Sequence, residues 1–303
     1  MRLFDYMSFR ALIAIVLLSF SVAACTDRIE IKTDDAPPHL VIYGYITGDT
    51  IRQSVKITRS TGYFATEKPG GISNAIVTIT SEDTSFVLIE NPEEPGLYQT
   101  ETVMAGVEGN TYSLTVVVDF DEDGIPEEYE ASSLLPYTIQ PDSIQIRPSS
   151  SFDDFLEVLL YGQLFEEGIN YYSIHVAANQ KVLNDSLHGF MIVDDEYLGR
   201  DITRGVACFY FDPTEDETLV YAGDTIKLRL DVLTKEFAEH INKAQEEISG
   251  SIPIFSGPPA NIGTNIKKTD PNNTVPLVGF FSAYGGRSVS TIVTEKDVER
   301  FKY

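Results

Sequence analysis

The strongest constraint on the fold is a series of short runs in which apolar and polar residues alternate, separated by turn residues. The series begins at Leu40, and "LVIYGYI", "SVKITRS" and "TYSLTVVV" are examples. A period of two is the pattern of a β-strand with one buried face. Over residues 40–138 the series predicts an antiparallel, immunoglobulin-like β-sandwich, which is built from about seven strands.

The strands become longer after two prolines close to residue 139. We therefore predict a second antiparallel β-domain over residues 139–303, in which "DTIKLRLDV" is the clearest strand. One amphipathic helix is expected over residues 234–249, because apolar residues recur at helical spacing from Phe237 onward. The last two apolar runs flank Gly285-Gly286 and predict a closing hairpin.

Residues 1–24 have the features of an export signal: basic residues, a short apolar run, and small residues directly before Cys25. The apolar run is short for a membrane-spanning helix, which needs about 20 residues. Small residues followed by cysteine resemble the lipobox of bacterial lipoproteins. We therefore predict that Cys25 carries diacylglycerol and an N-acyl chain such as palmitate, with residues 25–39 as a tether. The alternatives are an ordinary secretory signal that contains a cysteine and an uncleaved anchor.

Charge and cysteine content narrow the possible partners. The formal net charge of −24 repels phosphate backbones, so we expect no nucleic-acid partner. Besides Cys25 the chain has only Cys208, so there is no disulfide framework. Cys208 lies in the apolar run "GVACFYF" and is predicted to be a buried, inert thiol.

The acidic stretch "DFDEDGIPEEYE", residues 119–130, has the spacing D-x-D-x-D-G-x5-E of a calcium-binding loop. Ca²⁺ takes roughly six to eight oxygen ligands. The predicted ligands are the side chains of Asp119, Asp121, Asp123, Glu127 and Glu130 and the carbonyl of Ile125. The flanking sequences read as strands, where an EF-hand would have helices. The alternative is a solvated acidic hairpin with Asp-Gly at its turn.

Catalytic motifs are missing from the sequence. The four histidines form no H-E-x-x-H pair, and there is no G-x-S-x-G, Walker A or G-x-G-x-x-G pattern. We therefore predict that the protein is not an enzyme. Tryptophan is absent, which disfavours a glycan receptor because such surfaces commonly use its ring as a stacking platform.

Strand and turn patterns along nearly the whole mature chain resemble one family. "LVIYGYITGD", "VKITRSTGYF", "PGLYQT" and "GNTYSLTV" are similar to its N-terminal half, and "FSGPPANIGTNI" with "VGFFSAY" to its C-terminal end. It is the Bacteroidota lipoprotein family called domain-of-unknown-function family 4249. The resemblance implies an outer-membrane lipoprotein, often encoded beside a TonB-dependent transporter, with no established activity.

These features lead to one principal hypothesis and two alternatives. The principal one is a lipid-anchored, non-enzymatic outer-membrane accessory protein that partners a TonB-dependent transporter in ligand capture or as a scaffold. The first alternative is a calcium-stiffened adhesion or structural module of the cell surface. The second is a hydrolase whose residues come together only in the fold. The face of the outer membrane, cell surface or periplasm, stays open.

Overall fold

Most of the chain pairs into β-strands. The computed structural model describes residues 37–62, 68–82, 84–214, 219–249 and 262–299. Strands account for 46% and helices for 9%, which confirms the expected mainly-β fold. The predicted signal peptide and nearly all of the tether lie outside the described residues.

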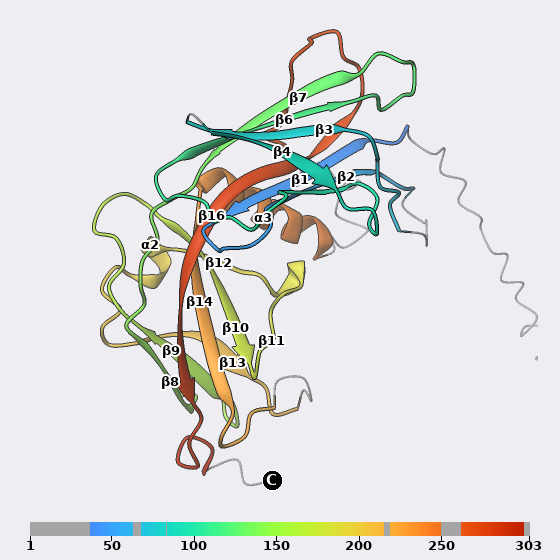
Figure 1. Ribbon diagram of the computed structural model, residues 1–303. Helices are drawn as coiled ribbons and strands as arrows, with labels where there is room; N and C mark the ends of the chain where they lie inside the picture. The colour runs from blue at the N-terminus through green and yellow to red at the C-terminus, as the bar shows by residue number, and fades with distance from the viewer. Residues whose placement is uncertain (1–36, 63–67, 83, 215–218, 250–261, 300–303) are drawn as a thin grey trace, which may run out of the picture. The chain divides into compact units, whose positions relative to one another are not determined.

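The elements follow one another in the order shown in Figure 1. The first half contains β1 (Leu40–Thr47), β2 (Ser54–Arg59), β3 (Ile76–Ser81), β4 (Thr84–Glu90), β5 (Leu97–Gln99), β6 (Thr111–Val118) and β7 (Glu127–Leu134). The second half contains β8 (Ser143–Pro148), β9 (Leu156–Tyr161), β10 (Tyr171–Ala178), β11 (Lys181–Val182), η1 (Leu187–Gly189), β12 (Met191–Asp194), α2 (Asp195–Leu198), β13 (Val206–Phe211), β14 (Thr225–Leu233), α3 (Lys235–Ile248), β15 (Lys267–Lys268) and β16 (Leu277–Ile292).

The first core lies between two layers of one long, 13-stranded sheet. Strands β1, β2 and β5 form one layer and β3, β6 and β7 the other, and β4 joins them because it pairs with both β3 and β5. The alternation seen in the sequence sets the orientation of each strand. In β1, for example, Leu40, Ile42 and Ile46 are fully buried in this core. The two layers confirm the expected β-sandwich.

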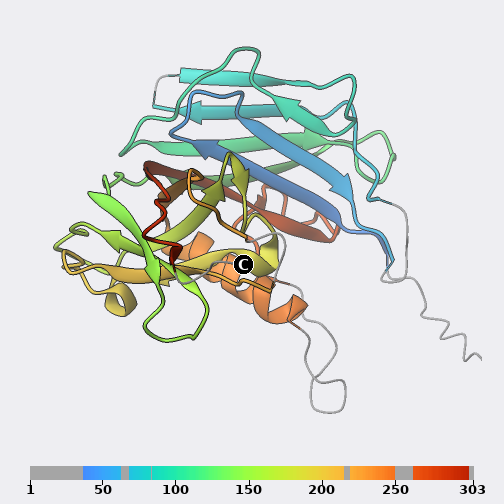
Figure 2. The same ribbon diagram turned by 90° about the horizontal axis from the view of Figure 1, so that it is seen from below.

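The second core lies between the other end of the long sheet and a separate sheet of three strands, β13, β9 and β8. Strands β10 and β14 pair antiparallel and contribute Ile174 and Leu228, while β9 contributes Val158. All three side chains are fully buried. Figure 2 shows the strands of this half and those of the first half from below.

The longest strand, β16, connects the two cores. Its first half pairs parallel with β1 and places Phe281 and Ala283 in the first core. Its second half pairs antiparallel with β14 and packs Val289 against the second core. Because β15 also returns to β7, residues after the predicted boundary at 138/139 complete the first core.

The closing hairpin expected at Gly285-Gly286 is wrong. Both glycines lie inside β16, opposite Val232 and Asp231 of β14. A Cβ on Gly286 would overlap with the side chain of Asp231 and the carbonyl oxygen of Leu230. This glycine therefore permits a close approach between strands, not a turn.

The predicted helix is α3, which begins after Thr234. The Thr234 hydroxyl accepts a hydrogen bond from the backbone N–H of Phe237 at 3.3 Å and caps the helix. The apolar face of α3 packs against Phe280 and against tyrosines on the outer face of β1. No helix in the described ranges is long and apolar enough to cross a membrane.

Candidate functional site

A cavity of about 800 Å³ opens between α3 and the outer face of the long sheet. We call it the aromatic pocket. It is lined by Tyr43, Tyr45, Asp49, Ser173, His175, Asp185, Leu187, Phe190, Arg229, Asp231, Leu233, Phe237, His240, Ile241, Ala244 and Tyr284. Its size and its mixture of aromatic walls with a few convergent polar groups are typical of small-molecule sites.

The aromatic wall follows from the two periodicities of the elements that form it. On β1, Tyr43 and Tyr45 alternate with core residues and so lie on the opposite face of the strand. On α3, Phe237 lies on the face that packs against β16. Its ring stacks on that of Tyr284 at a centroid distance of 5.8 Å and lies 6.0 Å from the ring of Tyr45.

His240 is fixed as a neutral ring by two contacts. Its Nδ1 lies 2.9 Å from the carbonyl oxygen of Gly263 and therefore donates to it. Its Nε2 lies 3.4 Å from the hydroxyl of Tyr43, which then donates to the ring. Burial lowers the pKa of His240. His240 is thus held in one orientation in the wall of the pocket.

The floor of the pocket is an ion-pair chain. Arg229 Nε donates to Asp231 at 2.7 Å, while its Nη1 and Nη2 contact the two carboxylate oxygens of Asp49 at 2.9 and 2.8 Å. The Asp231 side chain is only 3% exposed and that of Asp49 is 43% exposed. This series of ion pairs therefore runs from the buried Asp231 to Asp49 at the mouth of the pocket.

Strand pairing explains why these groups meet. β10 and β14 are antiparallel, with His175 opposite Arg229 and Ser173 opposite Asp231. Cross-strand neighbours lie about 5 Å apart at Cβ, so all four side chains project from the same face. In the sequence the pair on β10 is more than fifty positions from the pair on β14, and no local motif marks them.

Ser173, His175 and Asp231 have the residue types of a nucleophilic triad but not its geometry. The Ser173 hydroxyl lies 3.0 Å and the Asp231 carboxylate 3.6 Å from the same ring nitrogen, Nε2. A triad needs the serine and the carboxylate on opposite nitrogens, so that one proton can pass through the ring. Ser173 is also only 2% exposed. The arrangement is that of a structural network.

Burial shifts the charge states of this network. It lowers the pKa of His175, although Asp231 opposes the shift. It raises the pKa of Asp231, although the Arg229 guanidinium opposes that shift. Burial raises the pKa of Tyr284 to about 12, with a further contribution from Asp231. At neutral pH the histidine and the tyrosine are therefore uncharged.

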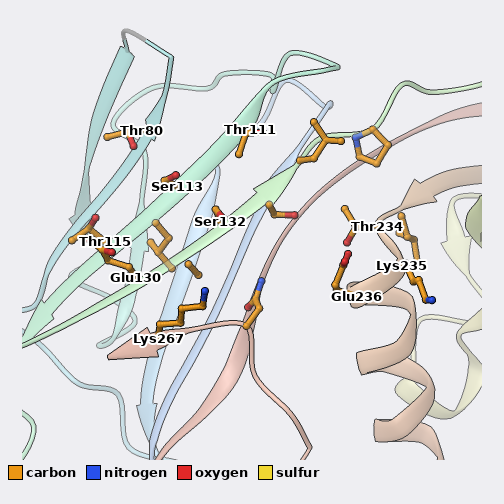
Figure 3. A pocket seen from close by; sticks show the side chains of 17 residues that line it. Thr80, Thr111, Ser113, Thr115, Glu130, Ser132, Thr234, Lys235, Glu236 and Lys267 are labelled. Carbon is orange, nitrogen blue, oxygen red and sulfur yellow. The ribbon is translucent and has the colours of Figure 1, made fainter. Parts of the chain in front are cut away.

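A second cavity, of about 1030 Å³, lies beside the N-terminus of α3. Figure 3 shows Thr111, Ser113, Thr115 and Ser132 on the sheet, across from Glu236 of α3 and its N-cap residue Thr234. Lys267 and Glu130 add one charge of each sign. This surface is hydroxyl-rich and lacks an aromatic wall, so the aromatic pocket is the better candidate.

The acidic loop brings three of its predicted ligands together. Oxygens of Asp119, Asp121 and Asp123 lie within 4.8 Å of one another. The Asp119 carboxylate also accepts from the N–H of Gly124 at 3.0 Å, and Gly124 has a φ of +87°. One carboxylate oxygen of Asp119 is buried without a hydrogen-bond partner. These residues therefore fit a cation with oxygen ligands.

The other predicted ligands are not part of this cluster of aspartates. Glu127 accepts a hydrogen bond from the N–H of Phe120 at 3.1 Å, and the carbonyl of Ile125 stays a predicted ligand. Glu130 lies in β7 opposite Thr115, three rungs from the end of the ladder, which is about 10 Å along the strand. Because the segments that flank the loop are strands, Glu130 lies within β7, away from the three aspartates.

The structure tests the prediction for one of the two cysteines. Cys25 lies outside the described residues. Cys208 is 3% exposed, and its thiol donates to the carbonyl of Val158 at 3.4 Å. Burial raises the pKa of Cys208 to about 12. This confirms a buried, unreactive thiol.

The fold and the site define a mainly-β protein in which the long strand β16 contributes to two cores and an aromatic pocket opens beside the helix α3. The chain belongs to the family described as "Domain of unknown function (DUF4249)", which matches residues 26–289. The resemblance seen in its strand and turn patterns is thereby confirmed.

Other comparisons add no functional information. No curated protein matches this chain. The crystal structure of the chicken CNTN1 FN1-FN3 domains is similar at 16% identity and a TM-score of 0.27, over 66% of this chain and 64% of that one. This chain thus spans less than two thirds of that protein's length, and at so low a TM-score the likeness carries no argument.

Proposed function

We propose that the protein is a lipid-anchored, non-enzymatic accessory protein of the outer membrane that captures a small ligand in the aromatic pocket. A TonB-dependent transporter is its proposed partner. The observation that carries the proposal is the pocket itself: about 800 Å³ with five aromatic side chains and an ion-pair chain along its floor. The geometry of Ser173, His175 and Asp231 supports binding over catalysis.

Ligand capture is tested with the mature, detergent-purified protein. We would incubate it with small-molecule extracts of the growth medium and identify bound compounds by native mass spectrometry. Leu187 lines the pocket and is 38% exposed, so Leu187→Trp should fill it and abolish the bound mass. Val182 is equally exposed but does not line the pocket, so Val182→Trp is the matched control. Retention of the same compounds by Leu187→Trp would refute capture in this pocket.

The anchor and the partner are tested separately. Replacing Cys25 by serine should release the protein from the membrane fraction, and protease treatment of intact cells should show which face carries it. Lipid chains contribute about 0.8 kcal/mol for each buried methylene, so loss of acylation should be decisive. Co-purification of a TonB-dependent transporter with the wild-type protein would support the partnership. If no transporter co-purifies in repeated preparations, the proposed partnership is refuted, while ligand capture still stands.

A calcium-stiffened surface module is the second candidate function. The observation in its favour is the convergence of Asp119, Asp121 and Asp123. Without Glu130 the site is open to solvent, so we expect a weak Kd of roughly 10⁻⁴–10⁻³ M. Calorimetry should show calcium binding that Asp121→Asn removes and the exposed control Asp153→Asn keeps. A titration without heat at millimolar calcium would exclude this function.

A further inference from the structure

We infer that the ligand of the aromatic pocket is an organic cation, an amine or quaternary ammonium group attached to an apolar or aromatic body. The inference rests on the proposed function, because it names the ligand class for that same pocket. Three features of the pocket support it: its charge balance, the engagement of Arg229 with two carboxylates, and its aromatic rings.

The lining carries an excess of negative charge. Asp49, Asp185 and Asp231 contribute three carboxylates, and Arg229 is the only lysine or arginine among the described residues that line it. Burial lowers the pKa of the two lining histidines, so they add no positive charge at pH 7. This excess of negative charge attracts a cation toward the pocket.

The guanidinium nitrogens of Arg229 are already engaged by carboxylates of the protein and leave no pair of free donors for an anionic ligand. Its Nε contacts Asp231, and its Nη1 and Nη2 both contact Asp49. Recognition of a carboxylate or phosphate uses this planar fork in a bidentate manner. An anion would therefore have to displace Asp49 from Arg229, and it would also meet the carboxylate of Asp185.

The aromatic rings supply the complementary surface. Tyr45, Phe237 and Tyr284 pack with centroid distances of 5.8 to 6.1 Å and form one wall, and Tyr43 lies beside it. Ring faces attract ammonium groups, and the attraction is stronger where water is excluded. Leu187, Ile241 and Ala244 of the same lining provide the contact for an apolar body.

A neutral polar ligand such as a sugar fits less well. Sugar hydroxyls need many directed donors and acceptors, yet the described lining contains no asparagine or glutamine. Its polar groups are largely engaged with one another, as Ser173 with His175 and Tyr43 with His240. Few are available to replace the water that a sugar would lose.

The test compares three probes that share a benzyl group against the full mature protein: benzyltrimethylammonium, benzyl alcohol and 3-phenylpropionate. We expect the cation to bind at least ~10-fold more tightly than either of the others, a difference of about 1.4 kcal/mol. Its binding should be lost in Leu187→Trp and kept in Val182→Trp. Asp185 is exposed, so Asp185→Asn should weaken cation binding ~2- to 5-fold, the range for an exposed charge contact, while Asp153→Asn, exposed and outside the pocket, should not.

The outcomes separate this inference from the proposed function. Preferential binding of benzyl alcohol or 3-phenylpropionate, blocked by Leu187→Trp, would overturn the cation and leave ligand capture standing. Equal binding of the cation to wild type and to Asp185→Asn would also overturn it. If no probe binds in a manner sensitive to Leu187→Trp, the cation inference falls, and the extract experiment decides ligand capture independently.

Discussion

Arg229 connects two carboxylates that differ in their exposure to water. The Asp231 side chain is 3% exposed, and burial raises its pKa even with the guanidinium 2.7 Å away. Asp49 at the mouth is 43% exposed. A buried charge without its partner costs far more than an exposed one, because nothing replaces the lost hydration. The two ends of this chain should therefore respond differently to mutation.

We expect Arg229→Met to lower the free energy of unfolding by about 3–5 kcal/mol, the usual cost of removing one partner from a buried ion pair. Asp49→Asn should cost less than about 1 kcal/mol, since surface pairs contribute little. Urea unfolding followed by circular dichroism measures both. Equal losses for the two variants would contradict the burial difference that the structure assigns.

The neutral state of His175 predicts how stability depends on pH. Because burial lowers its native pKa, the unfolded chain binds a proton more readily as the pH falls through about 6.5, the ordinary value. The unfolded state then holds more protons, so the free energy of unfolding decreases as the pH decreases. The raised pKa of Asp231 acts in the opposite direction, because the native state then holds more protons than the unfolded state.

His175→Gln should therefore make the decline in stability from pH 7.5 to pH 5.5 shallower than in wild type. Asp231, Arg229, Ser173 and Phe190 surround the ring, so the variant is compared by its slope and not by its absolute stability. His188 is exposed, and His188→Gln is the control. Parallel slopes for His175→Gln and wild type would show that this histidine titrates normally.

The pocket residues show where prediction from sequence stops. Periodicity places Phe237 and Ile241 on one face of α3, and this much is visible in the chain. The meeting of Ser173, His175 and Asp231 depends on the register of β10 against β14, and that register is set by packing across the whole sheet. Asp119, Asp121 and Asp123 could be predicted because their chemistry is local.

At the scale of elements, β16 depends on glycines at two crossing points. Gly279 has a φ of +119°, and a Cβ there would overlap with the carbonyl of Ile42 in the parallel partner β1. Residues other than glycine rarely adopt this conformation. The second crossing point is at Gly285-Gly286, which lie opposite β14. There the glycines allow a close approach between strands, where the sequence predicts a hairpin.

Gly279→Ala should lower the free energy of unfolding by about 1–3 kcal/mol or more, the range for a strained backbone position. Gly70 has open space around its Cα and no positive φ, so Gly70→Ala is the matched control and should be close to neutral. Thermal unfolding of both proteins measures the difference. A neutral Gly279→Ala would mean that β16 can shift away from β1 at little cost.

At the scale of the whole molecule, the two halves share β16, which contributes side chains to both cores. Local alternation predicts the strands of the first half correctly, but it contains no information on which distant strand closes the layer. Parallel pairing of β1 with β16 joins segments more than two hundred residues apart. Such contacts depend on the global topology, which short-range patterns do not encode.

This sharing predicts how fragments of the chain behave. Residues 37–138 alone lack Phe281 and Ala283, which are fully buried in the first core, and they expose the edge of β1 that pairs with β16. Burial of a large apolar side chain contributes about 1.5–3 kcal/mol, a large fraction of the 5–15 kcal/mol that stabilises a domain. We therefore expect this fragment to show no cooperative unfolding transition.

Joining residues 262–299 to the fragment through a flexible glycine-serine linker should restore a cooperative transition, because β15 and β16 can then pair with β7 and β1. The control carries Phe281→Ser in the joined segment and should remain unfolded, since a buried serine cannot fill the position of the ring. Denaturant unfolding monitored by far-ultraviolet circular dichroism distinguishes the three chains. A cooperative transition for residues 37–138 alone would show that the first core closes without β16.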